Sequence, residues 1–252
     1  MSTGESYQRI VVKVGTNLLT GNTDSLDMNR LKGLVSELAK LQKDGTQVIL
    51  VTSGAIVAGR QILDPNGEHK ETSFRQVLAA AGQSQLMGIY ESLFKKYDLH
   101  IAQALLTRSD LSDRVGYLNI RNTLISLIEL GVIPIINEND VVAVDELVGE
   151  TFGDNDTLSA LVANLVDADI LIMLSDVSGL FSTDPHEDPN ATLIQKVENI
   201  DASLEAIAGQ PWSNRSKGGM ETKLAAAKLA NSSGIPVVVA DGKEPSVLTR
   251  LV

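Results

Sequence analysis

Six short apolar segments recur along the chain, and longer segments of mixed polarity separate them. Each is a nearly continuous run of apolar residues, mostly Val, Ile and Leu, at residues 10–14, 48–51, 101–106, 132–136, 170–174 and 236–240. Runs without polar alternation are typical of strands that are covered on both faces, as in a parallel sheet. The pattern therefore predicts six buried strands in a mainly parallel sheet.

The segments between these runs carry apolar residues at helical spacing. Leu31, Leu34, Val35, Leu38 and Leu41 follow the pattern of one helix face, and so do Leu158, Leu161, Val162 and Leu165. The connections are long enough for right-handed crossover helices. We therefore expect the α/β class, as a three-layer αβα sandwich around the sheet.

Two segments break this rhythm. Residues 139–152 alternate like a short hairpin, and residues 181–199 contain Pro185, Pro189 and an acidic cluster. The sequence shows no linker-like change of composition, internal repeat or low-complexity tract. We therefore expect a single domain over residues 1–252.

Composition excludes several classes of function. The 252 residues include no cysteine, which excludes disulfides, thiolate zinc sites, iron–sulfur clusters and a cysteine nucleophile. The formal net charge of −11 argues against a nucleic-acid or anionic-membrane binder, because either would need a basic face. The three histidines lie in separate segments, so no metal site in the protein is expected.

The amino-terminal residues show no basic stretch followed by an apolar run, so no signal peptide is expected. The longest apolar runs fall far short of the ~20 residues that span a bilayer. A cytoplasmic protein without a membrane partner is the expectation, and the absence of cysteine fits a reducing compartment.

Polar motifs, most of them with glycine, follow all of the predicted strands except the third. They include residues 13–17, 52–56, 137–140 and 175–179, and two more motifs stand at predicted helix starts, residues 153–156 and 216–223. In open α/β sheets ligands bind beyond the carboxyl ends of the strands. We therefore expect a binding site at this edge of the sheet.

Two of these motifs allow a structural and a functional interpretation. Lys13 could extend to solvent from the end of its strand, or it could hold an anion. Gly15 favours the anion, because it lets backbone N–H groups approach a phosphate. Ser53 and Gly54 could form a simple serine N-cap or an anion site at a helix N-terminus, and the sequence leaves both open.

Two further motifs carry charge at predicted helix starts. Helix capping accounts for only one of the two acids Asp154 and Asp156. Two acids together with the amide of Asn155 are typical of a polar substrate site or of a group that organises lysines. Gly218 and Gly219, followed by Lys223, resemble a phosphate-binding turn; the alternative is a flexible loop with an exposed lysine. The sequence lacks a Walker P-loop and the protein-kinase signatures.

Together these motifs resemble the amino acid kinase family, and within it the branch that phosphorylates free glutamate. The match runs from Ile10 to about Gly242 and rests on residues 12–16, 53–56, 76–88, 136–140, 153–161 and 218–223. The branches that act on acetylglutamate or aspartate have two glycines after the first-strand lysine, where this chain has Gly15 and Thr16. One departure is Ser216-Lys217, where the family usually has Gly and Thr.

The resemblance implies a role for each motif. The catalytic residues would be Lys13 and Lys223, which flank the transferring phosphoryl group, and Asp156, which holds both ammonium groups. The residues that bind the amino acid would be Ser53, Gly54, Asn137, Asp140 and Asn155, with Asp140 paired to the α-ammonium group. The residues that bind the nucleotide would be Lys13, Gly15, Ser175, Asp176, Lys217, Gly218, Gly219, Met220, Glu221, Thr222 and Lys223.

The resemblance also implies an activity and an architecture. The fold would be that of carbamate kinase, with a substrate lobe over about residues 1–165, a nucleotide lobe over about residues 166–252, and without the PUA domain that many members carry. The reaction would be ATP-dependent phosphorylation of the L-glutamate γ-carboxylate to L-glutamyl 5-phosphate, the first step of proline biosynthesis, with Mg²⁺ arriving on ATP. A carboxylate of pKa ~4.3 is already ionised at neutral pH, so direct in-line attack needs no general base.

The same resemblance implies partners and leaves two alternatives. It implies a homo-oligomer (dimer or tetramer), proline as a feedback inhibitor, and transfer of the labile product to glutamyl phosphate reductase. One alternative is another member of the family, such as acetylglutamate kinase. The other is a non-catalytic sensor that binds an amino acid or a nucleotide on the same scaffold.

Overall fold

The computed structural model describes residues 7–21, 23–64, 66, 71–143, 155–183, 188, 190–208 and 219–252. All six predicted strands form, as β1 (Arg9–Val14), β2 (Gln47–Val51), β3 (Ile101–Leu106), β4 (Ile133–Glu138), β5 (Ile170–Ser175) and β6 (Val237–Asp241). They pair in the order β3-β4-β2-β1-β5-β6, and each neighbouring pair is parallel. The prediction of a mainly parallel sheet is confirmed.

Helices connect these strands. They are α1 (Thr16–Thr20), α2 (Met28–Lys43), α3 (Ala55–Leu63), α4 (Thr72–Phe94), the 3-10 turn η1 (Lys95–Tyr97), α5 (Arg108–Ser112), α6 (Arg114–Glu129), α7 (Asn155–Leu165), α8 (Ala202–Ala208), α9 (Met220–Asn231) and α10 (Val247–Leu251). Local chemistry fixes where several begin. Asp27, for example, caps α2 by accepting hydrogen bonds from the backbone N–H groups of Asn29 and Arg30.

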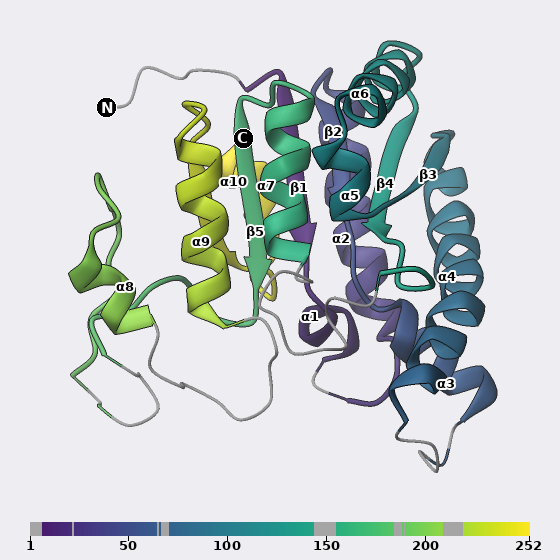
Figure 1. Cartoon of the computed structure of the whole chain (residues 1–252), viewed down its shortest axis with the longest axis horizontal. Helices are drawn as coiled ribbons and strands as arrows, with labels where there is room; N and C mark the ends of the chain where they lie inside the picture. The colour runs from purple at the N-terminus through teal and green to yellow at the C-terminus, as the bar shows by residue number, and fades with distance from the viewer. Residues whose placement is uncertain are drawn as a thin grey trace.

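The sheet is covered on both faces, so the three-layer sandwich is also confirmed (Figure 1). In β1 alternate side chains point to opposite faces: Ile10, Val12 and Val14 pack with α2, α4 and α10. Val11 packs with α6, α7 and α9 on the other face. Because both faces are buried, the strands have the continuous apolar sequence from which they were predicted.

The strand order places β1 where the chain changes direction across the sheet. β2 lies on one side of β1 and β5 on the other. The six strands of this sheet are parallel and so end at one edge, which β1, β4 and β5 reach toward the bottom of Figure 1. The first turns of α7 and α9 meet at this edge, so side chains far apart in sequence come together there. Such a reversal point is where open α/β sheets bind ligands.

The two irregular segments are described in part. Within residues 139–152, Asp140–Val142 form a turn after β4, and the rest of the expected hairpin, from residue 144, lies outside the described residues. Within residues 181–199, Phe181 and Leu193 form an isolated antiparallel bridge. Among the helices that the structure describes, none has both the length and the apolar character needed to span a bilayer.

Candidate functional site

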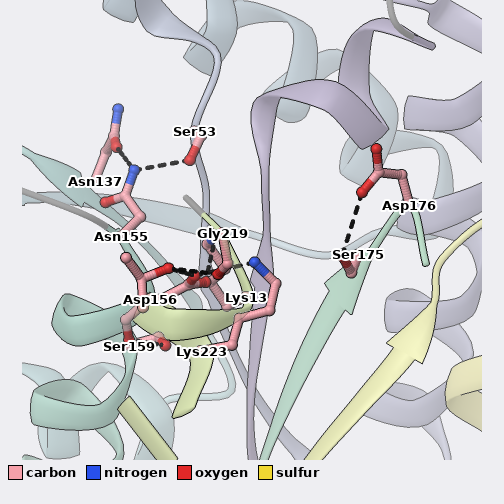
Figure 2. Close-up of polar contacts among 11 residues, drawn as sticks. Lys13, Ser53, Asn137, Asn155, Asp156, Ser159, Ser175, Asp176, Gly219 and Lys223 are labelled. Carbon is pink, nitrogen blue, oxygen red and sulfur yellow. Dashed lines mark hydrogen bonds and ion pairs between the residues drawn. The ribbon is translucent and has the colours of Figure 1, made fainter. Parts of the chain in front are cut away.

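Two lysines share one aspartate at the carboxyl edge of the sheet. Lys13 Nζ, from β1, lies 2.6 Å from Asp156 Oδ1, and Lys223 Nζ, from α9, lies 3.1 Å from Asp156 Oδ2. Figure 2 shows the three side chains converging from three different elements. All three are buried, with 4 % of Lys13, 0 % of Asp156 and 7 % of Lys223 exposed. The cluster therefore carries a net charge of +1 in a place that water scarcely reaches.

Hydrogen bonds fix the aspartate between the lysines. Thr222 Oγ1 donates to Asp156 Oδ2 at 2.8 Å, and Ser159 Oγ donates to the Asp156 carbonyl oxygen at 2.6 Å. Burial alone would raise the pKa of Asp156, but the ammonium groups of Lys13 and Lys223 outweigh it and hold this pKa well below its ordinary value. Asp156 therefore stays ionised at every pH at which such a protein works.

The burial of these residues decides between the interpretations that the sequence left open. A lysine that extends to solvent from a strand end, or from an exposed helix, would be accessible, and neither Lys13 nor Lys223 is. The Asp156 side chain faces the two lysines rather than serving only as a helix cap. The group that organises lysines is therefore the arrangement present.

The backbone after β1 passes close to this cluster. Gly15 precedes α1 as its N-cap residue, and a Cβ at this position would lie 3.5 Å from Lys13 Nζ. The turn from β1 into α1 thus brings backbone N–H groups to the same place as the Lys13 ammonium group. This is an arrangement that can hold a phosphate.

A chain of amide side chains lies beside the lysine cluster. Asn155 Nδ2 donates to Ser53 Oγ at 2.8 Å and to Asn137 Oδ1 at 3.1 Å, as drawn in Figure 2. Asn137 Nδ2 then donates to Gln83 Oε1 at 2.9 Å. This amide chain therefore joins the turn after β2 to β4, α7 and α4. It brings together three of the residues expected to bind the amino acid, Ser53, Asn137 and Asn155.

The turn between β2 and α3 is held from within the core. Gly54 is the N-cap residue of α3, with φ of 101°, and no side chain caps this helix. Ser53 is therefore not the simple N-cap that the sequence allowed. The preceding Thr52 is fully buried, and its hydroxyl group lies 2.8 Å from the hydroxyl oxygen of Tyr90 in α4.

Asp140 lies in the turn after β4, on the wall of a cavity. This cavity, about 390 Å³ in volume, is also lined by Ala79, Gln83 and Met87 of α4 and by Gln103 of β3. Burial raises the pKa of Asp140 to about 6, although the positive charge of Arg75 partly opposes the rise. A carboxylate that is short of favourable charge is suited to receive a ligand ammonium group.

The other described residues that are expected to bind the nucleotide lie at the carboxyl end of β5 and at the start of α9. Ser175 ends β5 and donates to Asp176 Oδ1 at 3.4 Å. Gly219 is the N-cap residue of α9, and Met220, Glu221, Thr222 and Lys223 form its first turn. Lys217 and Gly218 lie outside the described residues.

The structure adds residues that sequence reasoning missed. Gln83 lies within residues 76–88, which carry only the resemblance to the amino acid kinase family, and no local sequence pattern marks this side chain as polar and buried. Lys243 follows β6, and its Nζ donates to the Asp176 carbonyl oxygen at 2.7 Å. The signal that could have found Lys243 is its position just past the carboxyl end of the sixth strand.

The described residues do not form a protein cage for a metal ion. No group of three or more His, Cys, Asp or Glu side chains among them is placed to hold one. Asp156, the acid closest to the centre of the site, directs its two oxygens at lysines, so it does not fit as a metal ligand.

Comparison with known families agrees with this geometry. The model of the amino acid kinase family matches residues 8–241. The chain belongs to this family. The glutamate 5-kinase of Dehalococcoides mccartyi is 53 % identical over 248 residues, and that of Herpetosiphon aurantiacus is 52 % identical over 246 residues. Each alignment covers 98 % of this chain, which spans 66 % of the length of each of these curated relatives.

Solved structures show the same family fold. UMP kinase from Bacillus anthracis superposes with a TM-score of 0.61 at 17 % identity, covering 97 % of this chain and 91 % of the other. UMP kinase from Ureaplasma parvum gives a TM-score of 0.62 at 19 % identity, with 98 % and 94 % covered. At these identities the likeness establishes the amino acid kinase fold alone.

Proposed function

We propose that this protein phosphorylates the γ-carboxylate of L-glutamate with ATP, giving L-glutamyl 5-phosphate and ADP. The observation that carries the proposal is the buried Lys13–Asp156–Lys223 cluster at the reversal point of the sheet. The similarity to glutamate 5-kinases supports glutamate as the acceptor. The same similarity supports a place at the first step of proline biosynthesis.

The charge of the cluster suits phosphoryl transfer. An oxygen of the γ-carboxylate attacks the γ-phosphorus of ATP, a new P–O bond forms, and the bond to the β-phosphate oxygen breaks, so that ADP leaves with the electron pair. Negative charge spreads over the transferring oxygens, and preorganised cations in a site that excludes water stabilise it. Lys13 and Lys223 supply these cations, and Asp156 holds them in place.

No residue needs to remove a proton from the acceptor. A carboxylate of pKa ~4.3 is ionised at neutral pH, which agrees with a site built from lysines, amides and hydroxyl groups. Mg²⁺ enters as part of the Mg-ATP substrate and screens the phosphate charge. Gly15, Ser175, Asp176 and the segment from Lys217 to Lys223 line the nucleotide side in this proposal.

The other residues then divide between two lobes. Ser53, Gly54, Asn137, Asp140 and Asn155 bind the amino acid in a substrate lobe of about residues 1–165. Residues 166–252 form the nucleotide lobe. The raised pKa of Asp140 supports its pairing with the α-ammonium group, because the substrate brings further positive charge to this partly buried carboxylate.

The resemblance to the glutamate-phosphorylating branch supports further properties of the whole protein. They are a dimeric or tetrameric homo-oligomer, inhibition by proline, a cytoplasmic location, and transfer of the product to glutamyl phosphate reductase. An acyl phosphate hydrolyses readily, which supports rapid consumption by a second enzyme.

One assay tests the proposal against its alternatives. ADP release is measured with Mg-ATP and L-glutamate, with hydroxylamine present to trap the acyl phosphate, and N-acetylglutamate, aspartate and UMP run in parallel. We expect hydroxamate with free glutamate alone. Turnover with another acceptor would overturn the substrate assignment, and no turnover with any of the four, from folded protein, would favour a non-catalytic sensor.

A further inference from the structure

The amide chain beside the lysine cluster has a direction. Asn155 Nδ2 donates to Asn137 Oδ1, and Asn137 Nδ2 donates to Gln83 Oε1. Turning the Gln83 amide over alone would place two NH₂ groups against each other, so its orientation follows from that of Asn137. The chain therefore ends in a donor, Gln83 Nε2, which points away from Asn137.

This terminal donor is buried without a partner. Only 8 % of Gln83 is exposed, and within the described residues its Nε2 has no hydrogen-bond acceptor. Asn155 Oδ1, near the other end of this chain of amides, is likewise a buried acceptor without a hydrogen-bond donor within the described residues. Buried polar atoms are nearly always paired in folded proteins, so two such atoms in one network point to a missing ligand.

The unpaired donor belongs to a residue on the wall of the Asp140 cavity. Gln83 and Asp140 both line this cavity of about 390 Å³, which lies within the size range of small-molecule sites. The wall of this cavity thus carries both the side chain with the unpaired donor and a carboxylate. An α-amino acid presents a matching pair on one carbon atom, a carboxylate that accepts and an ammonium group that donates.

Helix packing holds Gln83 at this position. A Cβ on the preceding Gly82 would lie 1.8 Å from the carbonyl oxygen of Ala55, and a Cβ on Gly59 would lie 1.9 Å from that of Leu78. The backbones of α3 and α4 therefore touch, which only glycine permits. Because Ala55 directly follows the Ser53-Gly54 turn, the same contact fixes Gln83 relative to Ser53.

We propose that Gln83 determines specificity for an α-amino acid carboxylate: its Nε2 donates to the α-carboxylate of the substrate, while its Oε1 orients Asn137. The inference rests on the proposed function and adds a residue to it. In this arrangement Asp140 holds the α-ammonium group next to Gln83. The γ-carboxylate extends past Asn155 toward Lys13 and Lys223.

The test compares L-glutamate with L-isoglutamine, which carries a neutral carboxamide in place of the α-carboxylate. Isoglutamine keeps the γ-carboxylate that the proposed reaction phosphorylates, so selectivity is the KM for glutamate set against the KM for isoglutamine, each measured alone by ADP release. Gln83→Glu keeps an acceptor for Asn137 but places a negative charge where the donor was. We expect the KM for glutamate to rise about tenfold or more, the KM for ATP to stay within a factor of about three, and isoglutamine to bind at least as well as before.

Matched variants separate this role from a packing role. Gln83→Met removes both hydrogen bonds at similar volume and should also lower the selectivity. Gln85→Glu adds the same charge to the exposed face of α4 and should change neither constant. If both ligands weaken by the same factor in the Gln83 variants, or if neither constant changes, the assignment of Gln83 is wrong.

The same experiment distinguishes this failure from failure of the proposed function. The wild-type protein is assayed first for turnover of glutamate. Absence of wild-type turnover would overturn the proposed function itself. Wild-type turnover with unchanged selectivity in the Gln83 variants would overturn only the inference about Gln83.

Discussion

Replacing Asp156 with asparagine tests the lysine cluster most sharply. Asparagine has nearly the same shape and can still accept from Thr222, but it removes the charge that lies 2.6 Å from Lys13 Nζ and 3.1 Å from Lys223 Nζ. At an effective dielectric constant of about 20, these contacts correspond to about 6 and about 5 kcal/mol of gross Coulomb attraction. The variant leaves two buried ammonium groups facing each other.

The net effect is smaller than the gross attraction, because desolvation of the three groups opposes it. Removing one partner from a buried ion pair costs about 3–5 kcal/mol of stability, and we expect Asp156→Asn to lose that much in urea unfolding. Turnover should fall by a factor of about 10² to 10³ or more, since the two cations lose their fixed positions.

A second variant restores the charge balance without restoring the site. The double variant Asp156→Asn, Lys223→Met has one buried ammonium group fewer, so it should be more stable than Asp156→Asn alone while remaining inactive. Unfolding curves and ADP release report the two properties separately. If Asp156→Asn kept wild-type turnover, or if the double variant were no more stable than the single one, the electrostatic reasoning would be refuted.

Three further predictions concern neighbouring features of the site and its helices. Lys223→Met should lower kcat about 10²-fold or more in the ADP-release assay, whereas Lys228→Met, on the exposed side of the same helix, should leave it unchanged. Gly82→Ala should destabilise the protein by about 1–3 kcal/mol or more in urea unfolding, because its Cβ would overlap a carbonyl oxygen of the adjacent helix. Gly88→Ala is the control, since a Cβ there meets nothing within 4 Å, and it should stabilise the protein by up to about 1 kcal/mol in the same urea unfolding experiment. The pKa of Asp140 is about 6, so this carboxyl group becomes protonated as pH falls through 6, and kcat/KM for glutamate should decline on the acid side of the pH profile. Asp140→Asn should lower kcat/KM and remove this acid-side decline. A decline that persists in the variant would exclude Asp140 as its source.

The acid-side decline cannot come from Asp156. Its pKa lies well below the ordinary value, so its ionised form contributes to stability above the ordinary carboxyl pKa, and that contribution is lost only as pH falls through the lowered pKa. Between pH 5 and 8 Asp156 therefore keeps its charge. A pH profile that changes near 6 therefore reports on another group.

The layered architecture follows from local patterns in the sequence. Strands buried on both faces need continuous apolar runs, so the segments around Ile10 and Ile170 could be assigned without tertiary information. Helix α2 could be placed from the spacing of its leucines. The edge of the sheet at which ligands bind follows from the parallel arrangement itself.

The details of the site depend on contacts between distant segments, so the sequence could not supply them. Whether Lys13 is exposed or buried depends on Asp156, which lies 143 positions further along the chain and meets it only after α7 packs on the sheet. Gln83 is placed by the close contact of α3 with α4 at Gly82. The pKa of Asp140 depends on burial against the same helix, a quantity without a local signal.

Oxygen labelling tests the central claim most directly, namely that a carboxylate oxygen attacks phosphorus at the lysine cluster. L-Glutamate labelled with ¹⁸O in its γ-carboxylate is incubated with the protein, Mg-ATP and hydroxylamine, and the released phosphate is analysed by mass spectrometry. Hydroxylamine breaks the acyl C–O bond, so phosphate formed by this route carries one ¹⁸O atom from glutamate. We predict one label per phosphate released, whereas unlabelled phosphate would show that the phosphoryl group goes to water instead and would contradict the account.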